Sequence, residues 1–213
     1  MNEAIGLRAR KKERTRQAIS DAAIALFLAR GYDQVVVAEV AAAAEVSKPT
    51  LFRYFPTKED LVLHRFADHQ GEWARVVAER APDEPPLAAL HRHLVRGLHE
   101  RDPVTGLNDV REVLAFHGLV FGTPSLCAHL VHYRAADEAA LAEALRAAAG
   151  AGPDELGPRL AAAQLTAVRE VLARENWRRL TAGHTADQLL PQAEAAADRA
   201  FELLATGLAG RWA

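Results

Sequence analysis

The chain has 213 residues, half of them hydrophobic, so it can bury a core without disulfides and is not a largely disordered protein. A single cysteine, Cys127, excludes an intrachain disulfide, and no apolar stretch is long enough for a signal peptide or a membrane span, so we expect a cytoplasmic protein with no membrane partner. The net charge of −2 divides into +4 on residues 1–58 and −6 on the remainder, which favours contact of a polyanion with the N-terminal part alone.

The first sixty residues predict short helices around a small core. A helix is expected over about 7–30, ending before Gly31, because an apolar face recurs at helical spacing. A second short helix begins near Val37. The apolar positions of the two helices are Ile19, Ala22, Ala23, Leu26 and Phe27, then Val37, Val40, Ala41 and Ala44. The β-branched run 35–37 is too short to indicate a strand.

A third short helix follows, with Ser47 as its N-cap and Pro49 in its first turn. Pro56 ends it. Residues 57–60 (Thr-Lys-Glu-Asp) resemble a capping box, which predicts a long fourth helix running toward Arg80.

Beyond the loop at 82–86 the sequence predicts a larger helical body. Gly- and Pro-containing breaks separate helices expected at about 86–100, 107–118, 124–149, 154–182 and 185–209. The fold class is therefore all-α, with about nine helices.

Two short helices joined by a tight turn and braced by a longer one are typical of a helix-turn-helix, whose second helix enters the major groove of DNA. That helix needs a buried side, small or polar residues near its N-terminus, and phosphate anchors around it. Leu51 and Phe55 supply the buried side. The remaining candidates are Lys48, Pro49 and Thr50 at the N-terminal end, Arg53 and Tyr54 facing outward, and Lys58 at the start of the next helix.

These residues belong to one ordered pattern without gaps between about 14 and 62. It comprises Arg16 and the apolar face of the first helix, then Gly31-Tyr32-Asp33, Val40-Ala41, Ala44, Val46-Ser47 and Thr50-Leu51-Phe52-Arg53-Tyr54-Phe55-Pro56-Thr57-Lys58-Glu59-Asp60-Leu61. The pattern resembles the DNA-binding signature of TetR-type regulators. The resemblance implies an all-helical homodimer that binds a palindromic operator in double-stranded DNA. Most members repress, and a small-molecule effector in the C-terminal domain releases them.

The resemblance also implies a domain boundary and roles for residues. Residues 1–58 would form the DNA-binding domain with a basic N-terminal arm, and 59–213 the effector-binding and dimerisation domain. The base-reading role falls on Lys48, Pro49, Thr50, Phe52 and Arg53, supported by Ser47, and phosphate contacts fall on Tyr54 and Lys58. Arg10 and Lys11 of the arm either track the DNA backbone or belong to a solvated tail.

Two positions depart from the family pattern. Position 36 is usually a threonine that caps the second helix and touches phosphate, but here it is Val36, and losing such a cap costs about 1 kcal/mol. Position 45, usually a glycine with positive φ, is Glu45, which costs roughly 1 kcal/mol or more and adds a negative charge near DNA.

The last two helices have wide apolar faces, which the resemblance assigns to a four-helix bundle between two copies, although they could instead be ordinary core helices. The expected interface residues are Leu160, Ala167, Val171, Leu190, Ala193, Ala197, Phe201 and Leu204. The effector pocket, for which plain core packing is the alternative, is expected to involve Phe66, Trp73, Phe116, His117, His132, Tyr133 and Trp177.

We expect no metal site and no cofactor. The histidine pairs His129–His132 and His91–His93 are spaced for a shared metal, but no cysteine cluster or acidic partner accompanies them at a clear spacing. Cys127 is either a redox sensor or a buried inert thiol.

The sequence does not indicate an enzyme, because it has no phosphate-binding loop, nucleophile elbow or zinc-protease motif. The alternative to a regulator is a helical small-molecule-binding protein in which DNA binding is weakened or lost, and Val36 and Glu45 favour that reading.

Overall fold

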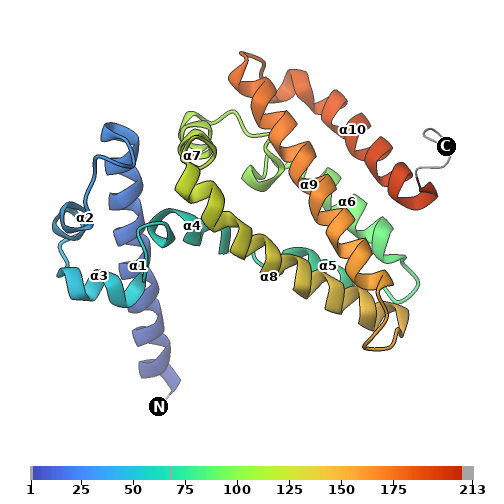
Figure 1. Cartoon of the computed structure of the whole chain (residues 1–213), viewed down its shortest axis with the longest axis horizontal. Helices are drawn as coiled ribbons and strands as arrows, with labels where there is room; N and C mark the ends of the chain where they lie inside the picture. Colours follow the sequence, from blue (N-terminus) through green and yellow to red (C-terminus); the bar gives the residue numbers. More distant parts are fainter. Residues whose placement is uncertain (1, 68, 208–213) are drawn as a thin grey trace. The chain divides into compact units, whose positions relative to one another are not determined.

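The computed structural model describes the backbone of residues 2–67 and 69–207, and the side chains of residues 10–65 and 69–207. Within these ranges the chain is all-helical, which confirms the predicted fold class (Figure 1). The helices are α1 (Asn2–Arg30), α2 (Val37–Ala43), α3 (Lys48–Tyr54), α4 (Asp60–Ala67), α5 (Glu72–Glu79), α6 (Pro86–His99), a short 3-10 helix η1 (Pro103–Thr105), α7 (Arg111–Gly122), α8 (Pro124–Ala149), α9 (Gly157–Thr181) and α10 (Ala186–Thr206).

The chain folds into two compact units, and the second half of α7 and the start of α8 belong with the N-terminal helices. Unit 1 comprises Met1–Asp68 and Ala115–Leu130, and unit 2 comprises His69–Leu114 and Val131–Ala213. The residues that pack together therefore do not divide at the predicted functional boundary after residue 58.

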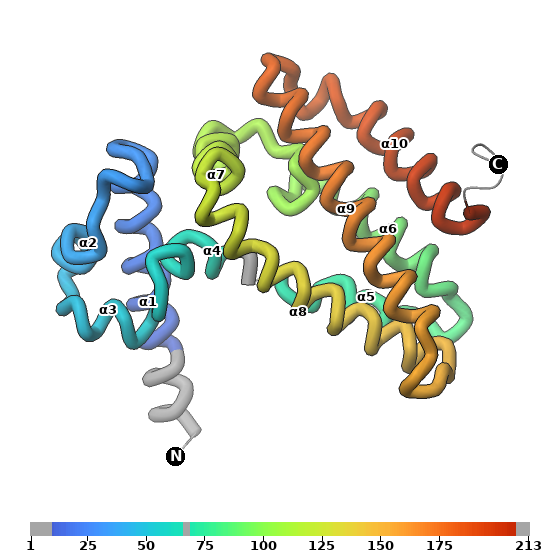
Figure 2. The backbone as a smooth tube through the Cα atoms, in the orientation of Figure 1, coloured from blue at the N-terminus to red at the C-terminus, as the bar shows by residue number. Residues whose placement is uncertain are grey.

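Unit 1 is organised around α1, which packs against α2 and α4 (Figure 2). Ile19, Ala23 and Phe27 of α1 are buried, and Phe27 stacks on Tyr32 with 4.9 Å between ring centroids. The buried Ser20 hydroxyl donates a hydrogen bond of 2.8 Å to the carbonyl of Leu61. This bond leaves no unsatisfied hydroxyl where α1 meets α4.

Unit 2 has its core between α5, α6, α9 and α10. The ring centroids of Trp73 on α5 and Phe201 on α10 are 6.4 Å apart, and the guanidinium of Arg169 lies 5.1 Å from the centre of the Trp73 ring. A buried amide joins α9 to η1, because Asn176 donates to the carbonyl of Thr105 at 2.9 Å. Thr185 and Gln188 form a reciprocal capping box at the start of α10.

The predicted long fourth helix is wrong, because the chain breaks between α4 and α5. Gly71 has φ +69°, a left-handed conformation that glycine adopts without a steric penalty, and its N–H donates to Asp137 Oδ1 at 2.8 Å. The expected capping box does open α4, since Thr57 and Asp60 each accept from the other's backbone N–H, at 3.1 and 3.0 Å.

The helix expected from residue 107 begins instead at Arg111. Asn108 holds the preceding turn, because its Oδ1 accepts from the N–H of Val110 at 3.0 Å and its Nδ2 donates to the carbonyl of Arg101 at 2.6 Å. An asparagine side chain that bonds nearby backbone in this way competes with helix formation.

Among the residues that the structure describes, no single helix has both the length and the hydropathy of a membrane span; α7 and α8 reach that threshold only as a pair, which bends by 94°.

We expect Gly106→Ala to destabilise unit 2 strongly. Gly106 has φ +70°, and a Cβ there would lie 1.9 Å from the carbonyl oxygen of Ala173. Gly150 is the matched control, because its φ is +61° and nothing lies within 4 Å of a Cβ. Chemical denaturation should show a loss of about 1 kcal/mol for Gly150→Ala, from the backbone alone, and at least about 2 kcal/mol more for Gly106→Ala. Equal losses of stability in the two variants would show that α9 does not contact Gly106 as closely as described.

Candidate DNA-binding site

The candidate recognition helix is α3, held by a cap at its start and two buried side chains. The Ser47 hydroxyl accepts from the N–H of Thr50 at 3.2 Å, and Pro49 lies in the first turn, as predicted. Leu51 and Phe55 are buried, with 0% and 1% of their surfaces exposed. The opposite side of α3 is therefore left facing outward.

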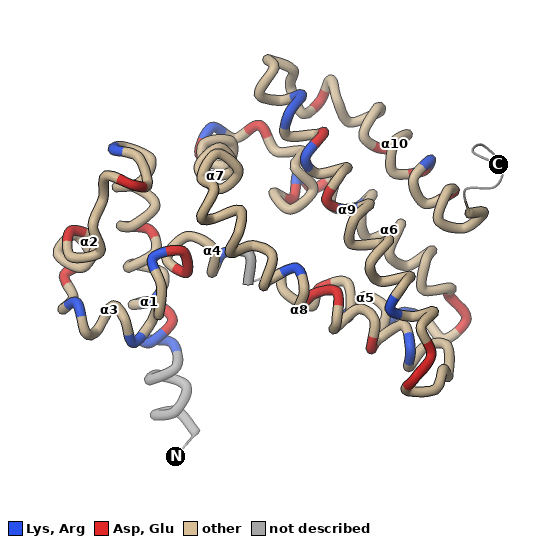
Figure 3. The backbone as a smooth tube through the Cα atoms, viewed as in Figure 1, with Lys and Arg blue, Asp and Glu red and all other residues tan. Residues whose placement is uncertain are grey.

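That outward side carries the residues predicted to read bases. Lys48, Pro49, Phe52 and Arg53 are exposed, while Thr50 and Tyr54 are half-buried. Two cations lie against rings on the same helix: Lys48 Nζ is 5.9 Å from the Phe52 ring centre, and Arg53 Cζ is 5.8 Å from that of Tyr54. Lys and Arg also occur on α1, as Figure 3 shows, so two elements of unit 1 offer positive charge.

Lys58 has a structural contact in the DNA-free chain. Its ammonium donates to the carbonyl of Tyr32 at 2.6 Å and lies 4.2 Å from the Tyr32 ring centre and 5.4 Å from that of Phe27. Burial, and then the nearby Glu59 carboxylate, raise the pKa of the Tyr32 phenol. Lys58 thus ties the start of α4 to the loop after α1, and its phosphate contact stays a prediction.

The start of α2 is capped by a residue that the sequence analysis did not single out. Val36 is 58% exposed and offers no side-chain cap, as expected. Glu39 compensates, because its Oε2 accepts from the N–H of Val36 at 3.0 Å while its Oε1 pairs with Arg30 at 2.7 Å. The Val36 N–H and then Arg30 lower the pKa of Glu39. The acidic residue three positions after Val36 is the sequence signal from which this cap could have been predicted.

The turn between α2 and α3 has the backbone that the family pattern requires, despite its residue. Glu45 adopts φ +53°, and the next N–H, that of Val46, bonds back to the carbonyl of Ala41 at 2.9 Å. A shallow groove of about 680 Å³ joins this turn to α1. Its lining comprises Arg10, Lys11, Arg14, Thr15, Ala18, Ala44, Glu45 and Val46. Glu45 and three basic residues of α1 therefore line the same groove.

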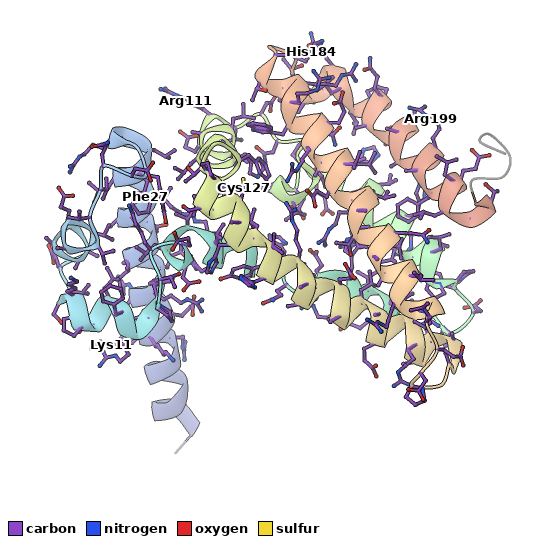
Figure 4. All side chains as sticks on the ribbon, in the orientation of Figure 1. Lys11, Phe27, Arg111, Cys127, His184 and Arg199 are labelled. Atoms are coloured by element: carbon purple, nitrogen blue, oxygen red, sulfur yellow. The ribbon has the colours of Figure 1, made fainter. Side chains whose placement is uncertain are left out.

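Figure 4 labels Lys11 in the N-terminal half of α1 and Phe27 near its C-terminal end, the first a predicted DNA contact and the second a core residue.

Comparison with known proteins agrees with this geometry. Residues 19–64 match the family model described as bacterial regulatory proteins, tetR family. The HTH-type transcriptional regulator TcmR of Streptomyces glaucescens is 32% identical over 173 residues, which cover 80% of this chain and 76% of TcmR. The chain belongs to the TetR family. It is a helix-turn-helix transcriptional regulator, and the resemblance seen in its sequence is confirmed.

One further curated relative matches a shorter part of the chain, and a solved structure matches its fold. The repressor LfrR of Mycolicibacterium smegmatis is 37% identical over 94 residues, 44% of this chain and 48% of LfrR. Among solved structures, native NalD of Pseudomonas aeruginosa, a secondary repressor of the MexAB-OprM multidrug efflux pump, has a TM-score of 0.57 at 21% identity. That alignment covers 88% of this TetR-family chain and 96% of NalD. At that identity the structural likeness concerns the fold alone.

The residues expected to form the effector pocket are divided between the two units. Phe116 and His117 lie in unit 1, and Trp73, His132, Tyr133 and Trp177 in unit 2, while the side chain of Phe66 lies outside the described residues. Burial lowers the pKa of His117 to about 4, so this imidazole is neutral at pH 7. A groove of about 440 Å³ between α8 and α9 is lined by other residues, among them Ala142, Arg146 and Pro158.

The residues predicted for the dimer interface differ in burial within the single chain, and the interface itself stays a prediction. Ala193, Ala197 and Phe201 have 6%, 1% and 5% of their surfaces exposed, because this side of α10 packs inside unit 2. Leu160 and Val171 of α9 are 52% and 67% exposed, and Ala167 between them is also exposed. Leu190 and Leu204 are partly buried against the core.

The histidine pairs singled out from the sequence have separate partners. His129 Nε2 lies 3.3 Å from Asp60 Oδ1, and the side chain of His132 is exposed. His91 Nε2 lies 2.8 Å from Asp198 Oδ1, and His93 Nε2 lies 3.2 Å from Glu72 Oε1. Cys127 is half-buried, with its Sγ 3.4 Å from the carbonyl oxygen of Val120.

We expect Glu45→Gly to stabilise the protein and strengthen DNA binding. Glycine removes the left-handed strain, about 1 kcal/mol, together with one negative charge beside the arm. Glu45→Gln is the matched variant, since it removes the charge but keeps the strain. Thermal denaturation should separate the two variants, whereas DNA titration should show both binding more tightly at low salt. Unchanged affinity in Glu45→Gln would show that this carboxylate lies too far from DNA to matter.

Proposed function

We propose that this TetR-family regulator is a homodimeric repressor that binds a palindromic operator and is released by a small molecule bound in its C-terminal part. The observation that carries the DNA-binding part is the outward face of α3, where exposed Lys48, Phe52 and Arg53 stand opposite buried Leu51 and Phe55. The relative LfrR is named as a repressor, which supports repression as the mode of regulation.

The face of α3 suits base reading for a chemical reason. Lysine and arginine donate to guanine acceptors, and the threonine methyl and the phenylalanine ring suit the methyl group of thymine. Lys48, Thr50 and Phe52 lie within one turn and a half of the N-terminal end, which is the end that meets base edges in helix-turn-helix proteins. Arg10, Lys11 and Tyr54 would then hold the phosphates.

A second copy of the chain is the partner that fits the exposed face of α9. Leu156, Leu160, Ala167 and Val171 recur along this helix at intervals that keep them on one side, and all four are exposed. The opposite side of α9 is buried in the core of unit 2. A two-fold dimer would cover this stripe and place two α3 helices on successive half-sites of an operator.

The effector part of the proposal rests on family membership and on aromatic and imidazole side chains in the C-terminal helices. Half-buried Tyr133 and Trp177 offer polar atoms on large apolar surfaces, the combination found in sites for small organic ligands.

We expect Lys48→Ala and Phe52→Ala each to weaken specific binding to the DNA upstream of the protein's own gene, by about 1–3 kcal/mol. Fluorescence anisotropy or mobility shift checks this. Lys11→Ala should weaken binding to every sequence alike and make it less dependent on salt. Arg75→Ala, an exposed arginine on α5, is the control and should bind as the unaltered protein does.

Absence of specific binding at low salt would instead support the second candidate, a helical small-molecule-binding protein that has lost operator recognition. The strained, acidic Glu45 in the helix-turn-helix favours that candidate.

We expect Val171→Glu to convert a dimer into a monomer, because in the dimer it would bury a carboxylate within the apolar α9 stripe. Light scattering coupled to size exclusion measures the mass. Val131→Glu on α8 is matched in type and exposure, at 56%, and should remain a dimer. A dimeric Val171→Glu protein, or a monomeric unaltered protein, would contradict the interface.

A further inference from the structure

Four side chains with metal-binding chemistry meet in unit 2 at the break between α4 and α5. His69 and Glu72 flank Gly71, His93 lies on α6, and Asp102 is the N-cap of η1. Glu72 bridges the two histidines: its Oε2 is 3.2 Å from His69 Nδ1 and its Oε1 is 3.2 Å from His93 Nε2. One ligand atom each from His69, Glu72 and Asp102 lies within 4.8 Å of the others.

We propose that His69, Glu72 and Asp102 bind a divalent transition-metal ion such as Zn²⁺. Ligand atoms around a tetrahedral zinc ion, each about 2.0–2.1 Å from the metal, stand about 3.3 Å apart. The 3.2 Å between His69 Nδ1 and Glu72 Oε2 fits that spacing. A carboxylate oxygen of Asp102 lies within 4.8 Å of these two ligand atoms, so a small side-chain movement would bring all three to coordination distance from one ion.

The neighbours of these ligands hold them in the form that a metal needs. Arg96 can only donate, so its hydrogen bond of 2.9 Å to His93 Nδ1 leaves the proton of His93 on Nε2. His93 therefore donates to Glu72 Oε1, which leaves Oε2 directed toward His69. Asp102 Oδ1 accepts from the N–H of Val104 at 3.1 Å, which leaves its second oxygen for the ion. Such outer hydrogen bonds orient metal ligands.

Charge and exposure also suit an ion. Glu72 and Asp102 bring two carboxylates to the site, and these attract a divalent cation. The side chains of His69 and Glu72 are 39% and 20% exposed, so an ion can enter from solvent. One imidazole and two carboxylates leave at least one coordination position for water or an external ligand.

The other histidine–carboxylate contacts of unit 2 lack this third partner. His91 pairs with Asp198, and His99 pairs with Glu194, each between α6 and α10. Among the described residues, only the set at the α4–α5 break gathers three different side chains of ligating type within reach of one ion. The contrast also supplies a control, because His99 is a histidine on the same helix as His93 with a single carboxylate partner.

The experiment uses the full-length protein after removal of metal with a chelator, titrated with Zn²⁺ alone. Calorimetry or competition with a zinc-binding dye should show one ion per chain with micromolar or tighter affinity, and the melting temperature should rise with Zn²⁺. Failure to bind a stoichiometric ion would overturn the proposal and leave operator binding, which is measured separately, unaffected.

Two conservative variants decide whether the ion sits at this place. Glu72→Gln and Asp102→Asn should each weaken Zn²⁺ binding roughly tenfold or more, while circular dichroism of the metal-free forms shows an unchanged fold. Asparagine keeps an oxygen that can cap η1, so loss of the ion in Asp102→Asn reports ligation rather than unfolding. His99→Ala should bind as the unaltered protein does. Equal binding by all variants, or equal loss in His99→Ala, would show that Zn²⁺ binds elsewhere.

Discussion

A helix of seven residues is not stable alone in water, so the whole DNA-facing surface depends on the burial of Leu51 and Phe55. Phe55 is held on two sides, by the Arg16 guanidinium of α1 at 5.6 Å and by the His64 ring of α4 at 5.2 Å. These contacts set the angle at which α3 presents Lys48 and Phe52. Changes in α1 or α4 would therefore alter DNA binding without touching a base-reading residue.

The two unusual residues around α3 act on different properties of the site. Val36 removes a side-chain cap, but Glu39 supplies a backbone bond and a pair with Arg30, so the fold of α2 is compensated locally. Glu45 has no such compensation in its backbone conformation, and it places a carboxylate in the groove beside Arg10 and Lys11. Strain and charge at one position make the turn the place where stability and operator affinity are coupled.

In unit 2, the two sides of α9 have different surroundings. Its buried side, which includes Leu165 and Asn176, completes the core and reaches η1, while its other side exposes Leu160 and Val171. In the proposed dimer, apolar residues on the buried side of this helix would stabilise the single chain, and those on the exposed side would stabilise the association of two chains. The turn at Gly71 has a comparable double effect, because it begins α5 and also brings His69 beside Glu72.

Local chemistry was readable from the sequence. Ser47, Pro49 and the Thr57–Asp60 box predicted the starts of α3 and α4, and the limits expected for α8 agree with Pro124–Ala149, since caps, prolines and glycines act within a few residues. Tertiary contacts decided the rest. Periodicity showed that α10 has an apolar face, but only packing showed that Ala197 and Phe201 fill their own core, because every buried face looks alike in sequence. The partner Asp137 for Gly71 and the meeting of Glu72 with His93 likewise depend on which segments the folded chain brings together.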